Sequence, residues 1–449
     1  MRYILLLIVA VSLLSCDATK KSRKTTYHKS TKHRKTHTAH NKHKVKKPNW
    51  RIKQDKPPVK EDMPYDYGYN LTSEKKDAYD IALLMPMRAH RVNPSEPDKI
   101  PKSTLRFVEF WAGAKLALAD LNQKGIHLNV TAKDTKYSSA DAKRIWRSLR
   151  NDPPDVIVGP YKRENVQYYA ERAKDYGFTF VSPWISSPKI TKNNPFYIQT
   201  KAGLRAHYET IFHHITKHYD ADQVYIVIKE KDAAKRKLME ELYAEQSEGG
   251  EAVLPHFIEV NVDTVLRGHE MIDSSSLDWE AHSPMVFFLP YASNKDKMFV
   301  YSFMQKFELL TGTNDAVLYG LYKWLDFGED VYDLINRMDV RVSVSGLVNP
   351  FNSATRQFRR RYFSTYGSLP GKDAYEGYDL FYYLGESLNK YGDKFQLHIN
   401  TQKPVSRIHT VYDLQPVMSK TENRVEYFEN IFVDLIEMKH YNFKRVGLR

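Results

Sequence analysis

Side chains able to bind an anion or a flat apolar group recur in short segments that follow apolar runs of the sequence. The cationic ones are Arg88, Lys162, Arg163 and Lys323. The aromatic ones are Trp184, Tyr291 and Tyr322. Guanidinium and ammonium groups pair with carboxylates and phosphates, and aromatic rings form the walls of ligand pockets. They predict a site for an anionic or bulky ligand; the alternative is that they are ordinary surface charges and aromatic residues that line a cleft.

The residue patterns of common catalytic sites are absent from the sequence. It contains no HExxH, no GxSxG, no Walker loop and no GxGxxG. His213 and His214 fall in an amphipathic stretch and are interpreted as a partly exposed helix face. His269 has one acidic neighbour, Glu270, and no second ligand at a useful spacing. The sequence therefore predicts a non-enzymatic protein without a cofactor or a metal site.

Short apolar strands alternate with amphipathic helices along the chain, which is typical of parallel sheets flanked by helices. The first series of strands is expected at 81–84, 128–132, 156–158 and 178–181, and its helices at 107–123, 139–150 and 164–176. The pattern restarts after Thr200, with strands expected at 223–228, 257–260, 285–289, 316–319 and 340–347, and helices at 206–219, 233–246, 353–366 and 374–390. The last segments, 408–414 and 427–437, have the pattern of strands.

In open α/β sheets, ligands bind beyond the carboxyl ends of the strands. This rule selects six segments, which are 85–90, 161–165, 182–187, 229–231, 290–293 and 319–324. The residues with binding chemistry named above all lie in these segments. We therefore expect the loops to converge on one ligand site.

Cys16 is the only cysteine of the 449 residues, and it follows an apolar stretch too short to span a bilayer as a mature helix. Arg2 supplies a short positive region before that stretch. Leu13-Leu14-Ser15-Cys16 resembles the lipobox of bacterial lipoproteins, which implies a signal peptide over residues 1–16 and lipidation of Cys16. The alternative is an ordinary signal peptide with a chance cysteine. Either interpretation predicts an exported protein and argues against nucleic-acid partners.

The net charge of +14 arises from one segment near the N-terminus. Residues 17–60 contain 13 Lys and 3 Arg against 2 Asp, so the rest of the chain is close to neutral. Residues 17–77 lack a periodic apolar face and are predicted to form a disordered basic tether. The tether is interpreted either as a solvated spacer or as a segment that contacts anionic lipid, cell-wall polymer or another envelope component.

From about Ala78 to Arg449 the chain resembles the type I periplasmic binding proteins, in particular the leucine and branched-chain amino-acid binding group. The resemblance rests on the order and spacing of the segments IALLMPM, FVEFWAGAKLALADLNQKG, PDVIVGP, YGFTFVSPWISSP and FRRRYFSTYGSLPGKDAYEGYDLFYYLGESL. The chain also resembles the outer-membrane lipoproteins that activate peptidoglycan synthases, which carry a domain of this fold.

The resemblance implies a two-lobed α/β fold in which each lobe is a parallel sheet flanked by helices. The first lobe would comprise residues 78–202 and 353–392, and the second lobe 203–352 and 393–449. A ligand would bind in the cleft between the lobes, which closes by hinge motion.

The resemblance carries over to the ligand loops only in part. Ser182 and Ser186 match positions at which the family holds its ligand. The loop from Tyr161 to Asn165, however, replaces a small Ser/Thr loop, and Trp184 stands where small residues would admit an amino-acid backbone. The acidic residue that would bind the ligand's amino group has no counterpart in residues 319–324. A free amino acid is therefore a doubtful ligand.

Two functions are consistent with the sequence. The first is a lipid-anchored cell-envelope protein that binds a small solute and works with a transporter. The second is a ligand-independent interaction protein of the envelope, for example a regulator of peptidoglycan synthesis. The long tether favours the second function somewhat, and the retained loops favour the first.

Overall fold

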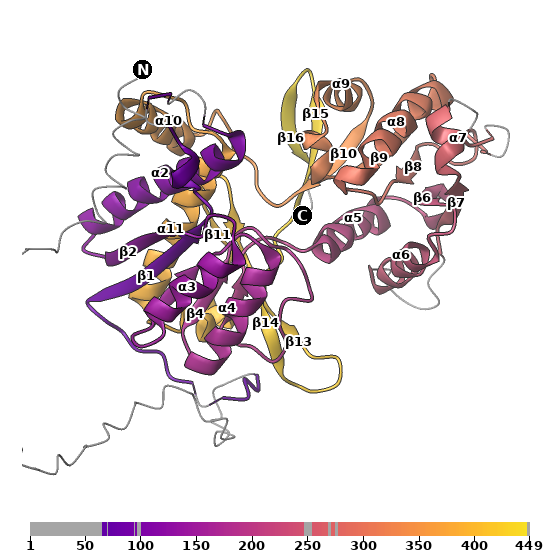
Figure 1. Cartoon of the computed structure of the whole chain (residues 1–449). Coiled ribbons are helices and arrows are strands. Elements are labelled where there is room, and N and C mark those ends of the chain that lie inside the picture. The colour runs from indigo at the N-terminus through magenta and orange to yellow at the C-terminus, as the bar shows by residue number, and fades with distance from the viewer. Residues whose placement is uncertain are drawn as a thin grey trace, which may run out of the picture.

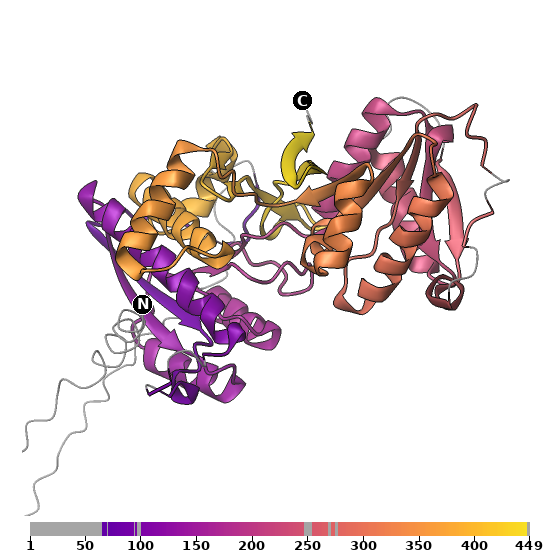
Figure 2. The ribbon, with the colours of Figure 1, turned by 90° about the horizontal axis from the view of Figure 1, so that it is seen from above.

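Two lobes make up the part of the chain that the structure describes. The computed structural model describes residues 65–446, apart from 70, 94, 97–99, 247–253, 268–270 and 274–276. Each lobe is built on a mostly parallel seven-stranded sheet flanked by helices (Figure 1). Seen from above, the lobes lie beside each other and are joined by a narrow middle region (Figure 2). The predicted two-lobed α/β fold is confirmed.

The sheet of the first lobe has the strand order β13-β14-β5-β4-β3-β1-β2. Its strands are β1 (Ala78–Met85), β2 (His127–Asp134), β3 (Val156–Val158), β4 (Thr179–Ser182), β5 (Tyr197–Gln199), β13 (Leu414–Met418) and β14 (Val425–Asn430). Its helices are α2 (Lys102–Gln123), α3 (Ser139–Leu149), α4 (Arg163–Tyr176), α10 (Ser353–Tyr366) and α11 (Lys372–Tyr391). Only β13 runs antiparallel to its neighbour in this sheet. The continuous burial of β3, β4 and β5 is typical of strands covered on both faces.

The sheet of the second lobe has the corresponding order β16-β15-β10-β9-β8-β6-β7, but β15 runs antiparallel to β10, whereas β14 runs parallel to β5 in the first lobe. Its strands are β6 (Val224–Lys229), β7 (His256–Val260), β8 (Met285–Phe288), β9 (Ala316–Leu321), β10 (Val340–Val344), β15 (Asp434–Lys439) and β16 (Asn442–Val446). Its helices are α5 (Leu204–His218), α6 (Ala233–Gln246), α7 (Val262–Arg267), α8 (Lys297–Thr311) and α9 (Glu329–Arg337). The hairpin of β15 and β16 closes one edge of the sheet.

The chain crosses between the lobes at residues 200–203, 345–352 and 431–433. The expectation that residues 393–449 belong to the second lobe is wrong for most of that range, because β13 and β14 are strands of the first sheet. The sequence pattern predicts one strand over 427–437. In the structure, the chain leaves the first sheet after Asn430 and enters the second at Asp434. Asn430, directly before the third crossing, is linked to the first crossing, because its side-chain amide donates to the carbonyl of Thr200 at 3.2 Å.

The ordered part of the chain begins before the predicted end of the tether at residue 77. Tyr67, Tyr69 and Leu71 are at most 4% exposed and pack in the core of the first lobe. The backbone N–H of Val425 donates to the carbonyl of Asp66 at 3.0 Å, which attaches this segment to the start of β14. The predicted tether is therefore too long at its C-terminal end, and its residues 17–64 lie outside the described residues.

Helices α2 and α11 approach each other closely because small residues lie where they cross. A Cβ at Gly377 would lie 2.0 Å from the carbonyl oxygen of Phe110, and one at Gly113 would lie 1.9 Å from that of Ala374. Only a residue without a side chain fits against backbone at these distances. The two helices are thereby fixed relative to each other beside the cleft.

We predict that Gly377→Ala lowers the free energy of unfolding by about 1–3 kcal/mol, because the added methyl group must push two helix backbones apart. Gly385→Ala is the matched control in the same helix, since its Cβ would meet the side chain of Leu121, at 2.4 Å, rather than a helix backbone. Urea unfolding of the three proteins checks this. Equal losses for both variants would contradict the role of the close backbone contact.

Candidate ligand site between the lobes

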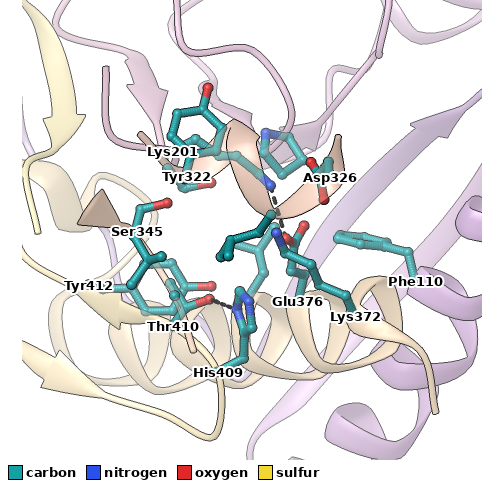
Figure 3. Close-up of a pocket in the computed structure, with 16 residues that line it drawn as sticks. Phe110, Lys201, Tyr322, Asp326, Ser345, Lys372, Glu376, His409, Thr410 and Tyr412 are labelled. Atoms are coloured by element: carbon teal, nitrogen blue, oxygen red, sulfur yellow. Dashed lines mark hydrogen bonds and ion pairs between the residues drawn. The ribbon is translucent and has the colours of Figure 1, made fainter. Parts of the chain in front are cut away.

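A polar cavity of about 80 Å³ lies between the lobes. The first lobe contributes residues that follow the carboxyl ends of β4 and β5, and the second lobe contributes residues at the ends of β9 and β10. Figure 3 shows charged side chains converging on this space from both lobes. The cavity therefore lies where open α/β sheets bind ligands.

Lys201 and Glu376 form an ion pair at one side of the cavity. Lys201 belongs to the first crossing, and its Nζ lies 2.9 Å from Oε1 of Glu376 in the first half of α11 (Figure 3). Burial is the largest single effect and alone would raise the pKa of Glu376, but the charges of Lys201, His409 and Lys372 and the hydrogen bond from Lys201 together lower it from 4.5 to about 2. Glu376 is thus held as a carboxylate, and the crossing is attached to α11.

Lys372, the first residue of α11, lines the same cavity and has no ion pair within 4 Å among the described residues. Its side chain is exposed to the cleft, yet the surrounding protein displaces enough water to lower its pKa, and the charge of Lys201 acts in the same direction. Asp326 lies across the cavity in the second lobe (Figure 3). Lys372 is therefore a cation without an ion pair within 4 Å among the described residues, although the carboxylates of Glu376 and Asp326 act on it from a greater distance.

His409 forms another part of the cavity wall. Its Nδ1 lies 2.8 Å from the hydroxyl oxygen of Thr410, and its ring packs against Gly346 of the second crossing. Burial lowers the pKa of His409 to about 4. The ring is consequently neutral at pH 7, and the charge of the cavity comes from its Lys, Asp and Glu side chains.

Four of the predicted site residues lie together on the first lobe, around the ring of Tyr137. The guanidinium of Arg88 lies 4.9 Å from the centre of that ring and the ammonium of Lys162 lies 5.8 Å from it. Tyr161 packs against Tyr137 and against Trp184, with ring centres 6.1 and 6.2 Å apart. This cluster places positive charge beside aromatic surface, but none of its four predicted residues lines the cavity between the lobes.

Trp184 fills the space at the end of β4. Its ring centre lies 5.3 Å from that of Phe107 and 5.1 Å from that of Phe110, and only 9% of the residue is exposed. Gly159 leaves room for it, because a Cβ there would lie 3.0 Å from the indole. The place where the family resemblance put the backbone of an amino-acid ligand is thus occupied by an indole ring of the protein.

The remaining predicted residues of the first lobe make local contacts. Arg163 donates to the hydroxyl of Ser187 and to the carbonyl of Lys189, so it joins the start of α4 to the loop after β4. Ser182 is buried at the end of β4, and Ser186 is partly buried in the loop that follows. None of these three residues lines the cavity between the lobes.

In the second lobe, only Tyr322 of the predicted aromatic residues lines the cavity, and it packs on His207 with ring centres 4.7 Å apart. Tyr291 is buried instead, where its hydroxyl accepts from the backbone N–H of Lys229 at 2.8 Å and donates to Asp232 at 3.2 Å. Lys323 is paired with Asp326 at 3.1 Å. The predicted residues therefore do not form one site.

The remaining sequence expectations concern Cys16, the histidines and the absence of a metal site. Cys16 and the pair His269 and Glu270 lie outside the described residues. His213 is exposed, whereas His214 is buried with its Nδ1 at 2.8 Å from the hydroxyl of Tyr319. Within the described residues, no cluster of His, Cys, Asp and Glu side chains could hold a metal ion.

The sequence analysis missed the charged residues that line the cavity. Lys201 and Glu376 are 175 positions apart, and neither belongs to a recognisable motif. Lys372 and Glu376 are one helical turn apart at the start of α11, which was the only local signal that they share a face. The position of Lys201 directly after β5 was a second signal, but this strand of three residues was not predicted.

Comparison with known proteins shows likeness in structure rather than in sequence. No known family profile and no curated protein matches the sequence. A protein of a branched-chain amino acid ABC transporter from Rhodospirillum rubrum has a TM-score of 0.57 and 14% identity, over 82% of this chain and 100% of that one. A periplasmic ligand-binding protein of a branched-chain amino acid ABC transporter from Burkholderia xenovorans has a TM-score of 0.54 and 12% identity, over 82% and 94%.

This chain has the fold of the type I periplasmic binding proteins. LpoA from Haemophilus influenzae is also similar, with a TM-score of 0.52 and 12% identity over 84% of this chain and 60% of LpoA. The fold is therefore shared with solute-binding proteins of transporters and with LpoA. None of the described helices is both long enough and apolar enough to cross a membrane.

We predict that Glu376→Gln lowers the free energy of unfolding by about 2 kcal/mol at pH 7, because it leaves Lys201 without its partner in a partly buried place. The folded-state pKa of Glu376 lies below its ordinary value of 4.5, so the ion pair stabilises the fold fully above pH 4.5. The difference in the free energy of unfolding between wild type and variant should shrink as the pH falls from 4.5 towards 2.

Urea unfolding at several pH values measures this difference. Glu209→Gln is the matched control, because Glu209 pairs with Arg205 at 2.6 Å on an exposed helix face and should contribute less than about 1 kcal/mol. A difference for Glu376→Gln that stays constant down to the lowest pH at which both proteins fold would refute the assignment.

Proposed function

We propose that this chain is a non-enzymatic binding protein of the bacterial cell envelope that holds a small anionic ligand between its two lobes. The observation that carries the proposal is the cavity to which both lobes contribute polar side chains at the carboxyl ends of their strands. Three short crossings join the lobes, which suits closure around a ligand by hinge motion. Delivery of the ligand to a transporter would fit this role.

Lys372 indicates the chemistry of the ligand. It faces the cavity without an ion-pair partner within 4 Å among the described residues, while Lys201 is already paired with Glu376. A carboxylate or phosphate group that entered the cleft would supply the missing charge and would raise the lowered pKa of Lys372 again. The ligand would therefore be anchored by its anionic group at the start of α11.

The size of the cavity indicates that the lobes must move for binding. At about 80 Å³ it is smaller than typical ligand pockets of roughly 300–1,000 Å³. The space at the end of β4 does not add to it, because Trp184 fills that space. A ligand would bind first to one lobe and become enclosed when the second lobe closes.

The test is a thermal-shift screen of the purified protein against amino acids, peptides, sugar phosphates, nucleotides and cell-wall fragments. A true ligand at about 100 times its Kd should stabilise the protein by roughly 2.7 kcal/mol. Lys372→Gln should weaken binding of that ligand about tenfold or more, because it removes the unpaired cation. Lys192→Gln, before the amino end of β5 at the opposite edge of the sheet, should leave binding unchanged.

A second function is favoured by the aromatic cluster of Trp184, Phe107 and Tyr161, which fills part of the place where this fold binds ligands. In that function the protein is a ligand-independent envelope scaffold, for example a regulator of peptidoglycan synthesis. A well-folded protein that shows no thermal shift across the whole screen would reject the solute-binding proposal and favour the scaffold.

Both functions include attachment to a membrane through a lipid on Cys16, which we propose from the lipobox-like sequence before it. Expression in bacteria fed an alkyne-labelled fatty acid tests this attachment. Wild type should incorporate the label and stay with the membrane fraction, whereas Cys16→Ser should do neither. Labelling of both proteins to the same extent would contradict attachment at this cysteine.

A further inference from the structure

A groove of about 720 Å³ lies on the first lobe, outside the cleft. It is bounded by α2, α10, α11 and the segment from Ser406 to Ile408, all of which belong to this lobe. Its volume lies within the range of about 300–1,000 Å³ that is typical of ligand sites. It shares no lining residue with the cavity between the lobes.

Positive charge exceeds negative charge around this groove. Lys124, Arg361 and Arg407 line it. Arg361 is paired with Asp120, whereas Lys124 and Arg407 share the single carboxylate of Glu386. The Nε of Arg407 is buried and has no hydrogen-bond partner. That atom has no exposed surface, so an anionic ligand is indicated by the charges instead. Among the described residues, Lys124, Arg361 and Arg407 face only the two carboxylates of Asp120 and Glu386, which leaves one positive charge for an anionic group of a ligand.

Tyrosine rings hold these cations in place. The ammonium of Lys124 and the guanidinium of Arg407 lie 4.9 and 4.7 Å from the centre of the Tyr382 ring. Tyr378 is fixed in turn, because its hydroxyl donates to Asp120 at 2.8 Å and its ring packs on that of Phe358. The charges therefore lie beside a preorganised aromatic surface rather than on freely moving side chains.

The rim of the groove carries amide groups with unused hydrogen-bonding capacity. The exposed residues Gln123 and Gln357 line it, and neither side-chain amide makes a hydrogen bond to another described residue. An amide side chain both donates and accepts, as a hydroxyl group does. Amides beside an aromatic ring and a cationic centre suit a ring-shaped ligand that is rich in hydroxyl groups and carries a carboxylate.

We propose that this groove binds an acidic saccharide. Its carboxylate would accept from Arg407 and Arg361, one face of a sugar ring would pack on Tyr378, and its hydroxyl groups would bond to the amides of Gln123 and Gln357. This site is separate from the proposed ligand site in the cleft, and it gives the first lobe an independent means of contact with acidic glycan.

Isothermal titration calorimetry of the full chain with a tetramer of galacturonic acid tests the proposal, with cellotetraose as the neutral probe. The acidic tetramer should bind. Its affinity should fall as the salt concentration is raised from roughly 50 to 500 mM, because salt screens the attraction between the carboxylates and the cations of the groove. Cellotetraose should bind at least tenfold more weakly. Absence of binding by the acidic tetramer, or equal binding of both probes, would overturn the proposal.

Two variants locate the site. Arg407→Gln should weaken binding about tenfold. Ala354→Trp changes an exposed residue of α10 that lines the groove, and its large ring should block binding sterically. This second variant tests the proposal even if Arg407→Gln fails to fold. The controls Arg356→Gln and Phe363→Trp change exposed α10 residues that do not line the groove and should bind as wild type does. Lys372→Gln should also bind normally, which separates this site from the cleft. Wild-type affinity of both Arg407→Gln and Ala354→Trp would refute the location.

Discussion

The close contact between α2 and α11 is the constraint on which both candidate sites depend. Gly113 and Gly377 allow the two helix backbones to touch, and the helices then present residues in two directions. Towards the cleft, the start of α11 supplies Lys372 and Glu376. Towards the outer groove, the same pair of helices supplies Asp120 and Tyr378. A change in the separation of the helices would therefore disturb both places at once.

Buried tyrosines connect the elements of this chain, which has no second cysteine for a disulfide. The hydroxyl of Tyr169 donates to the carbonyl of Ala142 at 2.9 Å and joins α4 to α3. The hydroxyl of Tyr366 donates to the carbonyl of Ala112 at 3.0 Å and joins α10 to α2. Each ring buries apolar surface while its hydroxyl satisfies a backbone carbonyl, so the contact is both apolar and directional.

The alternation of strands and helices was predictable because burial on both faces of a parallel sheet leaves a continuous apolar run in each strand. The assignment of strands to sheets was less predictable. The run from Tyr427 to Glu437 has the composition of a single strand, and only the topology shows that it passes from one sheet to the other at 431–433. The charged residues of the cleft were missed for a related reason, since Lys201 and Glu376 meet only after the crossings have formed. Trp184, in contrast, was recognisable from its size alone at a position that needs a small residue.

The way the chain enters the first lobe determines how the two lobes would respond to a pull on the N-terminus. Tyr67, Tyr69 and Leu71 are packed in the core of that lobe, so a load on the preceding chain passes directly into it. The second lobe receives the load only through three crossings of three to eight residues. A molecule attached through its N-terminal segment would therefore be held by its first lobe, and opening of the cleft would be a movement of the second lobe relative to that fixed lobe.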